Sequence, residues 1–549
     1  MLDTLDLSHI HDDPTRQAIR GLLNLVEDLK QENRALREDN QRLRDALNQL
    51  KGEQGTPVVK GNTPKPPAPD YSSERERHSP QRRGKRGARA PLPIDREQTL
   101  TVDPASLPPD AEFKGYDEVI VQDVVVRTDN VLFRKEKFYS PAAGKSYVAD
   151  LPAGYHGEFG PGIHALVLVF YFACQMTEPK IHAWFQQLGV QISSGEISNL
   201  VIKDHAVFHQ EKDAVSQAGL RSSPWQHIDD TATRVDGQNY HCHIVDNPLH
   251  TTYITLPAKD RLSVIDVLRN GQPRVFRYNA DAETWLDAAG VSAVTRRKLT
   301  CLPRDQDLDE ATLTQLLDTH LPRLGRQTRK WVLDALAVAA YQAQLEWPVI
   351  QALVCDGALQ FTGITDEVAG CWVHEGRHYK QLLPTVPLHR QELDRFLADF
   401  WHFYDELLAY RQQPTAEDRA RLDARFDALF ATQTGYWALD ERIRLTRAKK
   451  ACLLLVLAHP ELPLHNNPAE LGARQRVRKR AISFGPRTAE GVHAWDTFQS
   501  LGATARKLGV NFFHYLQDRI RGSHQIAPLD EILTEQAKDL ALGASWAPA

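Results

Sequence analysis

Leucine recurs at every seventh position near the start of the chain, and this period predicts one long helix that pairs with another. The leucines are Leu22, Leu29, Leu36, Leu43 and Leu50, and the residues three positions before them are Ile19, Val26, Asn33, Asn40 and Leu47. Leucine thus fills the d positions of a heptad, and two asparagines at a positions favour a parallel dimer in one register. We expect residues 1–51 to form a leucine-zipper coiled coil that joins two copies of the chain. A single amphipathic helix packed on its own chain is the alternative.

Residues 52–95 are rich in proline, glycine, serine and charge, a composition that buries no core and predicts a disordered basic linker. Within it lies a basic cluster made of Arg82, Arg83, Lys85 and Arg86. Two interpretations of this cluster are open. It is either an arm that contacts DNA phosphates or a solvated linker.

Length and composition limit the remaining choices. A chain of 549 residues with a hydrophobic fraction of 42% should divide into several globular domains. The net charge of −5 means that nucleic-acid binding must depend on local basic clusters. The six cysteines include no CxxC pair, which suits a reducing compartment and leads us to expect no structural zinc. Because no apolar run or leader is evident, we expect a cytoplasmic, nucleoid-associated protein without a membrane partner.

Two small modules are expected before the middle of the chain. Residues 96–155 are rich in β-branched residues and predict a β-rich module, with a hairpin that turns at Asp129-Asn130. Residues 156–218 are helical, with a helix at 179–188, a break at Gly189 and a second helix at 197–209 that begins with a serine cap. This layout resembles a DNA-binding helix-turn-helix, although plain helical packing would give the same pattern.

The middle and the end of the chain predict a mixed α/β core with helical insertions. Strand patterns at 225–235, 240–245 and 251–256 are joined by short turns and are followed by a helix at 260–269. Three antiparallel strands and a helix open the ribonuclease-H-like fold, and further strands are expected at 349–355 and 368–373. Long helices are expected at 389–412, 415–431 and 445–458. The core should therefore comprise 219–274, 346–384 and 459–522, with helical insertions at 275–345 and 385–458 and a C-terminal tail at 523–549.

Three acidic residues lie where such a core could gather them. Asp229 is inside the first strand, Asp356 ends a buried strand, and Glu470 begins an arginine-rich helix. Carboxylates brought together in this way bind pairs of Mg²⁺ ions that activate an attacking oxygen and stabilise a leaving oxygen in phosphoryl transfer. Each acid also has a simpler interpretation. Asp229 and Asp356 could be turn or surface residues, and Glu470 could complete a capping box with Asn467.

These motifs together resemble those of the insertion sequence 66 family of transposases. His227-Ile-Asp229-Asp230-Thr231 is similar to that family's Asp-Glu-Thr motif, and Cys355-Asp356-Gly357 to its Asp-Gly motif. Cys371-Trp372-Val-His374 with Arg377 resembles the Cys-Trp-Ala-His-x-x-Arg motif, and Asn466-Asn467-Pro-Ala-Glu470 the Asn-Asn-x-x-Glu-Arg motif. This chain departs from the family in lacking a CxxC segment, and in carrying His465 and Leu471 where the family often has Asp and Arg.

The resemblance implies a DNA transposase with an Asp-Asp-Glu site formed by Asp229, Asp356 and Glu470. It implies two Mg²⁺ (or Mn²⁺) ions on these acids, cleavage of element ends, and transfer of the 3′ ends to target DNA. Side chains expected to contact double-stranded DNA, besides the linker cluster, are His374, Arg377, Arg474, Arg476, Arg478, Lys479 and Arg480. The alternatives are a structural pair of His374 with Arg377 and a solvated basic face on the helix. Two alternatives are a nuclease that hydrolyses without joining and a non-catalytic relative that only represses or bridges DNA.

Overall fold

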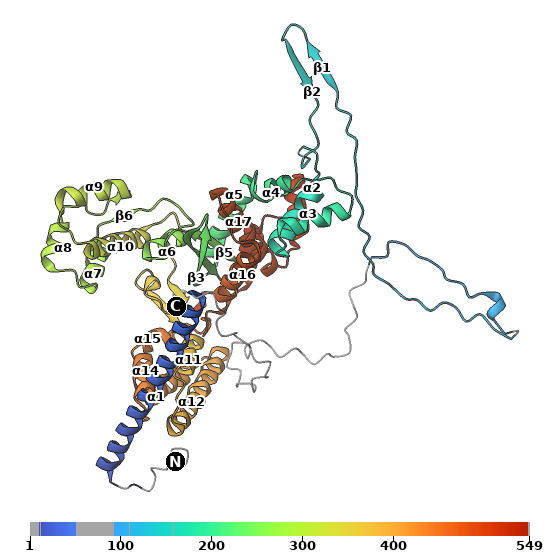
Figure 1. The fold of residues 1–549 in the computed structure, drawn as a ribbon. Helices are drawn as coiled ribbons and strands as arrows, with labels where there is room; N and C mark the ends of the chain where they lie inside the picture. Colours follow the sequence, from blue (N-terminus) through green and yellow to red (C-terminus); the bar gives the residue numbers. More distant parts are fainter. Residues whose placement is uncertain (1–9, 11, 51–92, 109, 156, 547–549) are drawn as a thin grey trace.

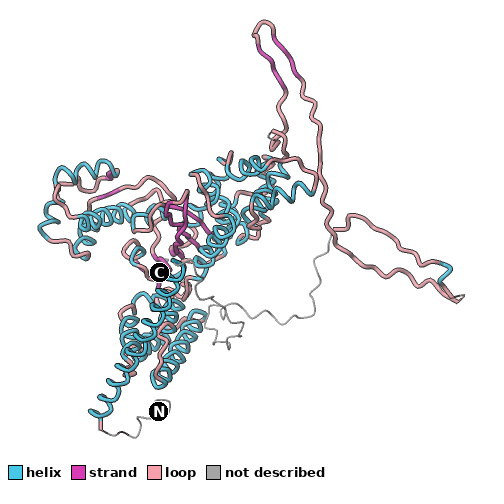
Figure 2. Tube along the Cα trace, in the orientation of Figure 1, coloured by secondary structure: helices cyan, strands magenta, loops and turns pink. Residues whose placement is uncertain are grey.

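The computed structural model describes residues 10, 12–50, 93–108, 110–155 and 157–546, so the basic cluster at 82–86 lies outside the described residues. A mixed β-sheet lies at the centre of the molecule and is surrounded by helices (Figures 1 and 2). The long N-terminal helix lies along a helical bundle on one side of this centre, and an extended segment projects from the other side (Figure 1).

The central sheet has three antiparallel strands followed by two parallel ones. The antiparallel strands are β3 (Trp225–Val235), β4 (Gln238–Asp246) and β5 (Thr251–Leu256). Strands β8 (Ala352–Cys355) and β9 (Glu367–Gly370) extend the sheet in the order β5-β4-β3-β8-β9. The five strands expected from the sequence are therefore present. The last one is shorter than predicted, because Cys371 caps helix α11 (Trp372–Lys380) instead of continuing the strand.

One face of the sheet is covered by α6 (Arg261–Leu268) and by residues 275–345, whose elements include α10 (Arg326–Ala343). Ile228, Val245 and Leu353 on this face belong to the same hydrophobic core as Leu313 and Val332 of that segment. The expected insertion is therefore helical, and it packs on the sheet as part of the central core. Its other elements are β6 (Phe276–Arg277), α7 (Ala280–Ala288), α8 (Ala293–Leu299), β7 (Asp307–Leu308) and α9 (Glu310–His320).

The opposite face carries α16 (Asn467–Ser483) and α17 (Ala489–Lys507). Behind them, a second hydrophobic core joins residues of α17 to helices on either side of it in the sequence. These are α2 (Pro161–Leu168), α3 (Glu178–Gln187), α4 (Ser194–Ile202), α5 (Ala206–Arg221), α18 (Phe512–Arg521) and α19 (Leu529–Asp539).

The helix-turn-helix segment differs from its prediction. Ser193 caps α4 through the backbone N–H of Glu196, as expected, but the predicted helix at 197–209 is wrong. The chain breaks at Asp204, which has a φ of 63°, before α5 begins. Ile181, Phe185 and Ile197 are buried in the shared core, so α3 and α4 are packed as part of the helical layer.

A separate helical bundle holds the N-terminal helix. It contains α12 (Pro387–Gln412), α13 (Ala416–Leu429) and α14 (Trp437–Arg447), and the helix predicted at 445–458 is broken into shorter turns. Helix α1 (Asp13–Leu50) lies against this bundle (Figure 1). The Glu27 carboxylate accepts hydrogen bonds from the backbone N–H groups of Thr385 and Val386, each at 2.7 Å. The first turns of α1 are therefore packed on their own chain.

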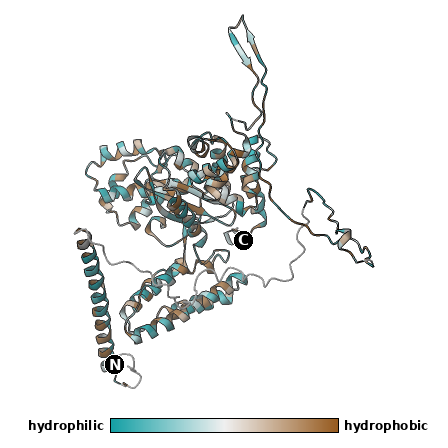
Figure 3. Ribbon diagram, turned by 45° about the vertical axis from the view of Figure 1, so that its right-hand side comes forward, coloured by the Kyte–Doolittle hydropathy of each residue, from teal (hydrophilic) through white to brown (hydrophobic). Residues whose placement is uncertain are grey.

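Most of the segment 93–155 stands clear of the other described residues and is extended (Figures 1 and 3), and only its last residues pack on α18. Strands β1 (Lys137–Ser140) and β2 (Lys145–Val148) form a hairpin around residues 141–144. The hairpin expected around Asp129-Asn130 is wrong, since its residues form no strand. Proline and Gly144, with a φ of 60°, supply the observed turn instead. Within the described ranges, no helix is long and apolar enough to cross a membrane.

Candidate functional site

Strand pairing brings Asp229 and Asp356 to neighbouring positions. Trp225, Gln226 and His227 of β3 pair in parallel with Ala352, Leu353 and Val354 of β8. Continuing this register by two residues sets position 229 opposite position 356. Side chains alternate along a strand, so Asp229 shares a face with Trp225 and Asp356 shares a face with Ala352 and Val354. Both acids therefore face the side of the sheet on which α16 lies, because Trp225, Ala352 and Val354 pack together there.

Helix α16 begins directly over these two strands. The side-chain amide of Asn466 donates to the Ile228 carbonyl at 2.8 Å, and its oxygen lies 3.0 Å from the His227 ring. Further along the helix, the Tyr253 hydroxyl donates to the Gly472 carbonyl at 3.2 Å. A Cβ at Gly472 would lie 2.9 Å from the Ile244 side chain, so the glycine allows a close approach to the sheet. These contacts hold Glu470 above the strands.

Two basic side chains of α11 hold the Glu470 carboxylate. Both terminal nitrogens of Arg377 donate to Glu470 Oε2 at 3.1 Å, and His374 Nδ1 lies 3.4 Å from Oε1. Helix α11 is itself anchored in the bundle by the buried Trp372, whose indole N–H donates to the Leu453 carbonyl. The capping-box interpretation of Glu470 is wrong, because α16 begins at Asn467 and Asn466 makes no side-chain cap.

The electrostatics of Asp229 reflect this crowding of acids. Burial and, to a smaller extent, the negative charges of Asp356 and Glu470 together raise the pKa of Asp229 to about 7. A single backbone hydrogen bond, from the Asp230 N–H, opposes the shift. The three carboxylates are therefore close enough to repel one another. A divalent cation would remove that repulsion.

Asp230 belongs to a different environment from Asp229. It points to the opposite face of β3, where Gln360 donates to its carboxylate at 2.9 Å and Lys259 lies 3.5 Å away. Gln360 follows the loop that begins at Asp356, and the Asp356 carboxylate accepts the N–H of Ala358 at 2.9 Å. Asp230 therefore ties this loop to β3, a role that the sequence did not indicate.

Cys371 of the Cys-Trp-x-His motif, for which the sequence offered no further zinc ligand, lies beside Glu470. The sulfur of Cys371, a nitrogen of His374 and an oxygen of Glu470 lie within 4.8 Å of one another, a mixed ligand set of the kind that suits zinc. However, Arg377 already contacts the other ring nitrogen of His374, and burial raises the pKa of Cys371 to about 12. The carboxylate oxygens of Asp229, Asp356 and Glu470 are of the ligand type that Mg²⁺ and Mn²⁺ prefer, but they do not lie as close together as the Cys371, His374 and Glu470 atoms do in the described residues.

The basic residues of α16 divide into two groups. Arg474 and Arg478 are exposed, and Arg480 is partly exposed and donates to the Ala232 carbonyl of β3. Arg476 and Lys479 are buried, with 1% and 0% of their surface exposed, and cannot reach DNA in this arrangement. Arg476 pairs with Asp496 at 2.7 Å, and the Lys479 ammonium lies 3.2 Å from the centre of the Tyr171 ring. The expectation that these two contact DNA is therefore corrected.

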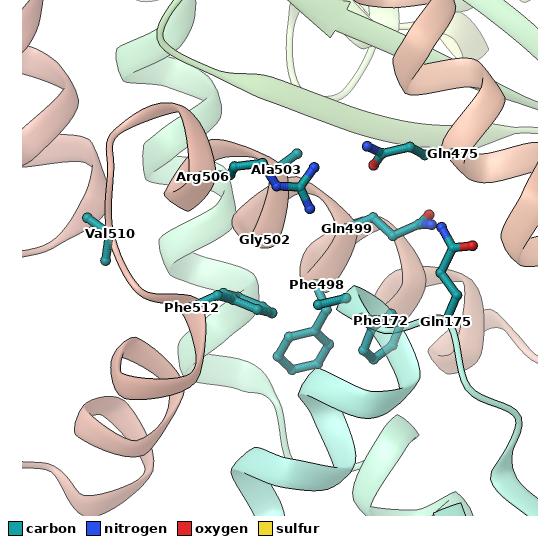
Figure 4. A pocket seen from close by; sticks show the side chains of 11 residues that line it. Phe172, Gln175, Gln475, Phe498, Gln499, Gly502, Ala503, Arg506, Val510 and Phe512 are labelled. Carbon is teal, nitrogen blue, oxygen red and sulfur yellow. The ribbon is translucent and has the colours of Figure 1, made fainter. Parts of the chain in front are cut away.

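A cavity of about 200 Å³ lies away from the acids, between α16, α17 and the start of α18 (Figure 4). Phe172, Phe498 and Phe512 form its apolar part, and Gln475 and Arg506 are among its polar residues. None of the three acids lines it. The three acids lie instead where β3 passes the end of β8, beneath the start of α16.

The comparison with protein families agrees with these motifs. The family described as Transposase IS66 family matches residues 341–494, a range that contains Asp356, Arg377 and Glu470. The chain belongs to the IS66 transposase family. A relative named Uncharacterized protein y4jO, from Sinorhizobium fredii, is 30% identical over 329 residues, which cover 58% of this chain and 99% of the relative. No solved structure matches this IS66 family member.

Proposed function

We propose that this IS66 family chain is a Mg²⁺-dependent Asp-Asp-Glu transposase that cleaves element ends and joins them to target DNA. The observation that carries the proposal is the convergence of Asp229, Asp356 and Glu470 on one face of the sheet. The strand order, three antiparallel strands and then two parallel ones, is the order expected for a ribonuclease-H-like core, and it supports the proposal. An acid within one central strand, an acid at the end of its neighbour and a third acid on a covering helix suit phosphoryl transfer.

Asp229, Asp356 and Glu470 would hold two Mg²⁺ or Mn²⁺ ions. When bound, these ions supply an activated attacking oxygen and a stabilised leaving oxygen for the displacement at phosphorus. A largely buried Asp229 beside two further acids fits such a role, since its charge costs free energy without a cation. Arg377 and His374 contact both oxygens of the Glu470 carboxylate and would hold this ligand residue in position.

The proposed DNA surface runs along the outside of α16. Arg474 and Arg478 are exposed there, and Arg480 lies where the helix crosses β3. Arginines at this spacing can contact the phosphates of a duplex whose scissile bond lies at Glu470. The linker cluster at 82–86 would add sequence-independent affinity.

Dimerisation through α1 completes the proposal, since a transposase handles two element ends together. Leu29, Leu36 and Leu43 of the d positions are between 54% and 70% exposed. Leu23 and Glu27, which pack on the bundle, are buried and lie on another side of the helix. The alternative of packing on the same chain therefore holds for the first turns only. The heptad surface beyond Leu29 is available to a second copy.

The test uses duplexes that tile the DNA on both sides of the gene, incubated with purified protein and Mg²⁺. We expect nicking at one boundary on each side, and joining of precut 3′ ends to a plasmid. Asp356→Asn should abolish both reactions and retain DNA binding. Asp366→Asn, an exposed acid outside the site, is the matched control and should retain activity.

The other outcomes separate the alternatives. Nicking without joining would identify a hydrolytic nuclease. Binding without nicking in Mg²⁺ or Mn²⁺ would identify a protein that represses or bridges DNA. Equal activity of the wild type and Asp356→Asn would refute the assignment of the site.

A further inference from the structure

An exposed aromatic residue ends the helix that carries Glu470. Phe484 caps α16 in the left-handed conformation, with a φ of 61°, and 87% of its surface is exposed. A bulky side chain is rarely found in this conformation, which costs about 1–2 kcal/mol and which glycine would adopt freely. The ring also buries no apolar surface that would offset this cost. Strain without a packing benefit is typical of residues that act on a ligand.

The turn that presents Phe484 is fixed to β3. The Phe484 backbone N–H donates to the Arg480 carbonyl at 2.8 Å, and the Arg480 guanidinium donates to the Ala232 carbonyl. The next residue, Gly485, has a φ of 87°, and a Cβ there would lie 3.1 Å from the Arg234 carbonyl oxygen. The ring is therefore presented by a supported turn, and β3, the strand that supports it, also carries Asp229.

The surroundings of Phe484 indicate the class of ligand. The exposed side of α16 carries Arg474 and Arg478, and Leu471 and Ile482 on the same side are each 41% exposed. Positions 471, 474, 478 and 482 follow the helical spacing, so they form one stripe that leads from Glu470 towards Phe484. Arginines for phosphates beside an exposed apolar side chain are typical of proteins that insert a wedge between base pairs.

We propose that Phe484 is a wedge that inserts into a base step of the duplex whose end lies at Glu470. This inference rests on the proposed function. The helix rises about 1.5 Å for each residue, so Phe484 lies about 21 Å from Glu470 along its axis. Base pairs are stacked about 3.4 Å apart, and the wedged step should therefore lie within about six base pairs of the cleaved phosphate. Opening this step would bend the end away from flanking DNA and favour its entry into the site.

The test measures base unstacking directly. The bound duplex from the tiling experiment is prepared with 2-aminopurine at successive positions on either side of the cleaved bond. With wild-type protein and Ca²⁺ in place of Mg²⁺, we expect a fluorescence increase at one step within that range. Phe484→Gly should lose the increase, although the strain is relieved and the fold is retained. Phe484→Trp should keep it.

Leu345→Ala is the control, since Leu345 is 98% exposed and lies outside α16. It should leave the fluorescence increase unchanged. An equal increase with wild type and Phe484→Gly would overturn the inference while leaving the transposase proposal intact. If the wild-type protein bound none of the tiling duplexes, the result would instead contradict the proposed function and, with it, the wedge proposal.

Discussion

At the scale of single residues, the site depends on which side chains support the acids and which contact DNA. Arg377 donates twice to Glu470, whereas Arg474 is exposed one helical turn further along α16. Both arginines were expected from the sequence to contact DNA. Because Arg377 contacts Glu470 and Arg474 is exposed, we expect Arg377 to position the acid and Arg474 to bind DNA.

Arg377→Gln should lower cleavage by about 10- to 100-fold at saturating DNA, because Glu470 loses its orientation. Its DNA affinity should change little. Arg474→Gln should instead weaken DNA binding and change cleavage at saturating DNA little. The slope of log affinity against log salt concentration should fall by about one. Cleavage under single-turnover conditions and filter binding at several salt concentrations separate the two effects. Loss of affinity in Arg377→Gln with unchanged cleavage would assign it to the DNA surface.

The pH dependence of the folding stability tests whether Lys479 is buried in the folded protein. Burial lowers the pKa of Lys479 to about 7, well below its ordinary value, so the unfolded chain binds this proton more tightly than the folded one. The destabilisation is fully present below pH 7 and fades as the pH rises towards the unfolded value. Lys479→Met should therefore raise the unfolding free energy by about 2 kcal/mol at neutral pH, less than the pKa shift alone implies because the Met176 carbonyl loses its donor.

The measurement is chemical denaturation of wild type and Lys479→Met at about pH 6 and about pH 9, where linkage predicts that their difference shrinks. A difference that stays constant across this range would show that the lysine is not desolvated in the folded protein.

At the scale of elements, α1 has a buried side on the bundle and an exposed side, to which we assign different roles. Glu27 is 1% exposed and satisfies two backbone donors of the bundle, whereas Leu36 and Leu43 remain exposed. Substitutions on one side should leave the role of the other intact.

Glu27→Ala leaves two backbone N–H groups without their acceptor and should destabilise the chain by about 1–3 kcal/mol. Thermal unfolding and protease sensitivity of residues 13–35 measure the effect. Glu32→Ala, at an exposed position of the same helix, is the control and should change stability by less than about 0.5 kcal/mol. Equal destabilisation by both substitutions would mean that α1 does not dock through Glu27.

Leu36→Arg combined with Leu43→Arg should convert a dimer into a monomer, since arginine at d positions cannot pack in a zipper. Light scattering after size-exclusion chromatography gives the mass, and the unfolding of the rest of the chain should stay as in wild type. A wild-type chain that is monomeric at high concentration would refute the zipper.

The sequence predicted those elements whose pattern is local. The alternation of apolar residues identified the antiparallel strands, and aspartate within a strand marked Asp229. The sequence pattern did not predict the helix break at Asp204. An aspartate in the left-handed conformation gives no sequence signal as strong as that of glycine or proline. The sequence pattern also placed Arg476 and Lys479 on the surface by their charge. Their spacing from the buried Ala469, Gly472 and Ala473 was the better guide, since these positions recur on one side of the helix.

At the scale of the whole molecule, the end of the chain closes the base of the central sheet. The Trp225 indole N–H donates to the Leu542 carbonyl at 2.6 Å, and the Trp546 ring stacks on His459 at 3.7 Å. The segment expected as a C-terminal tail thus packs on the first residue of β3.

Removal of residues 541–549 should expose Trp225 and lower the unfolding temperature by several degrees, because a buried indole loses its cover and its acceptor. Differential scanning calorimetry measures the shift, and a red shift of tryptophan emission reports the exposure. Trp437→Ala, which alters a surface tryptophan in α14, is the control and should leave the unfolding temperature unchanged within about 2 degrees. An unchanged unfolding temperature in the truncated chain would show that the segment is not docked.

The parallel pairing of β3 with β8 has one more consequence. A shift of one residue in the register of either strand would move its aspartate to the opposite face of the sheet. The aspartate of the other strand would then have no neighbouring acid. Intermediate versions of the proposed catalytic centre are therefore not accessible by small shifts of the backbone. Partly misfolded molecules should have no activity rather than weak activity. The specific activity of a mixed preparation would therefore measure the fraction of correctly folded protein.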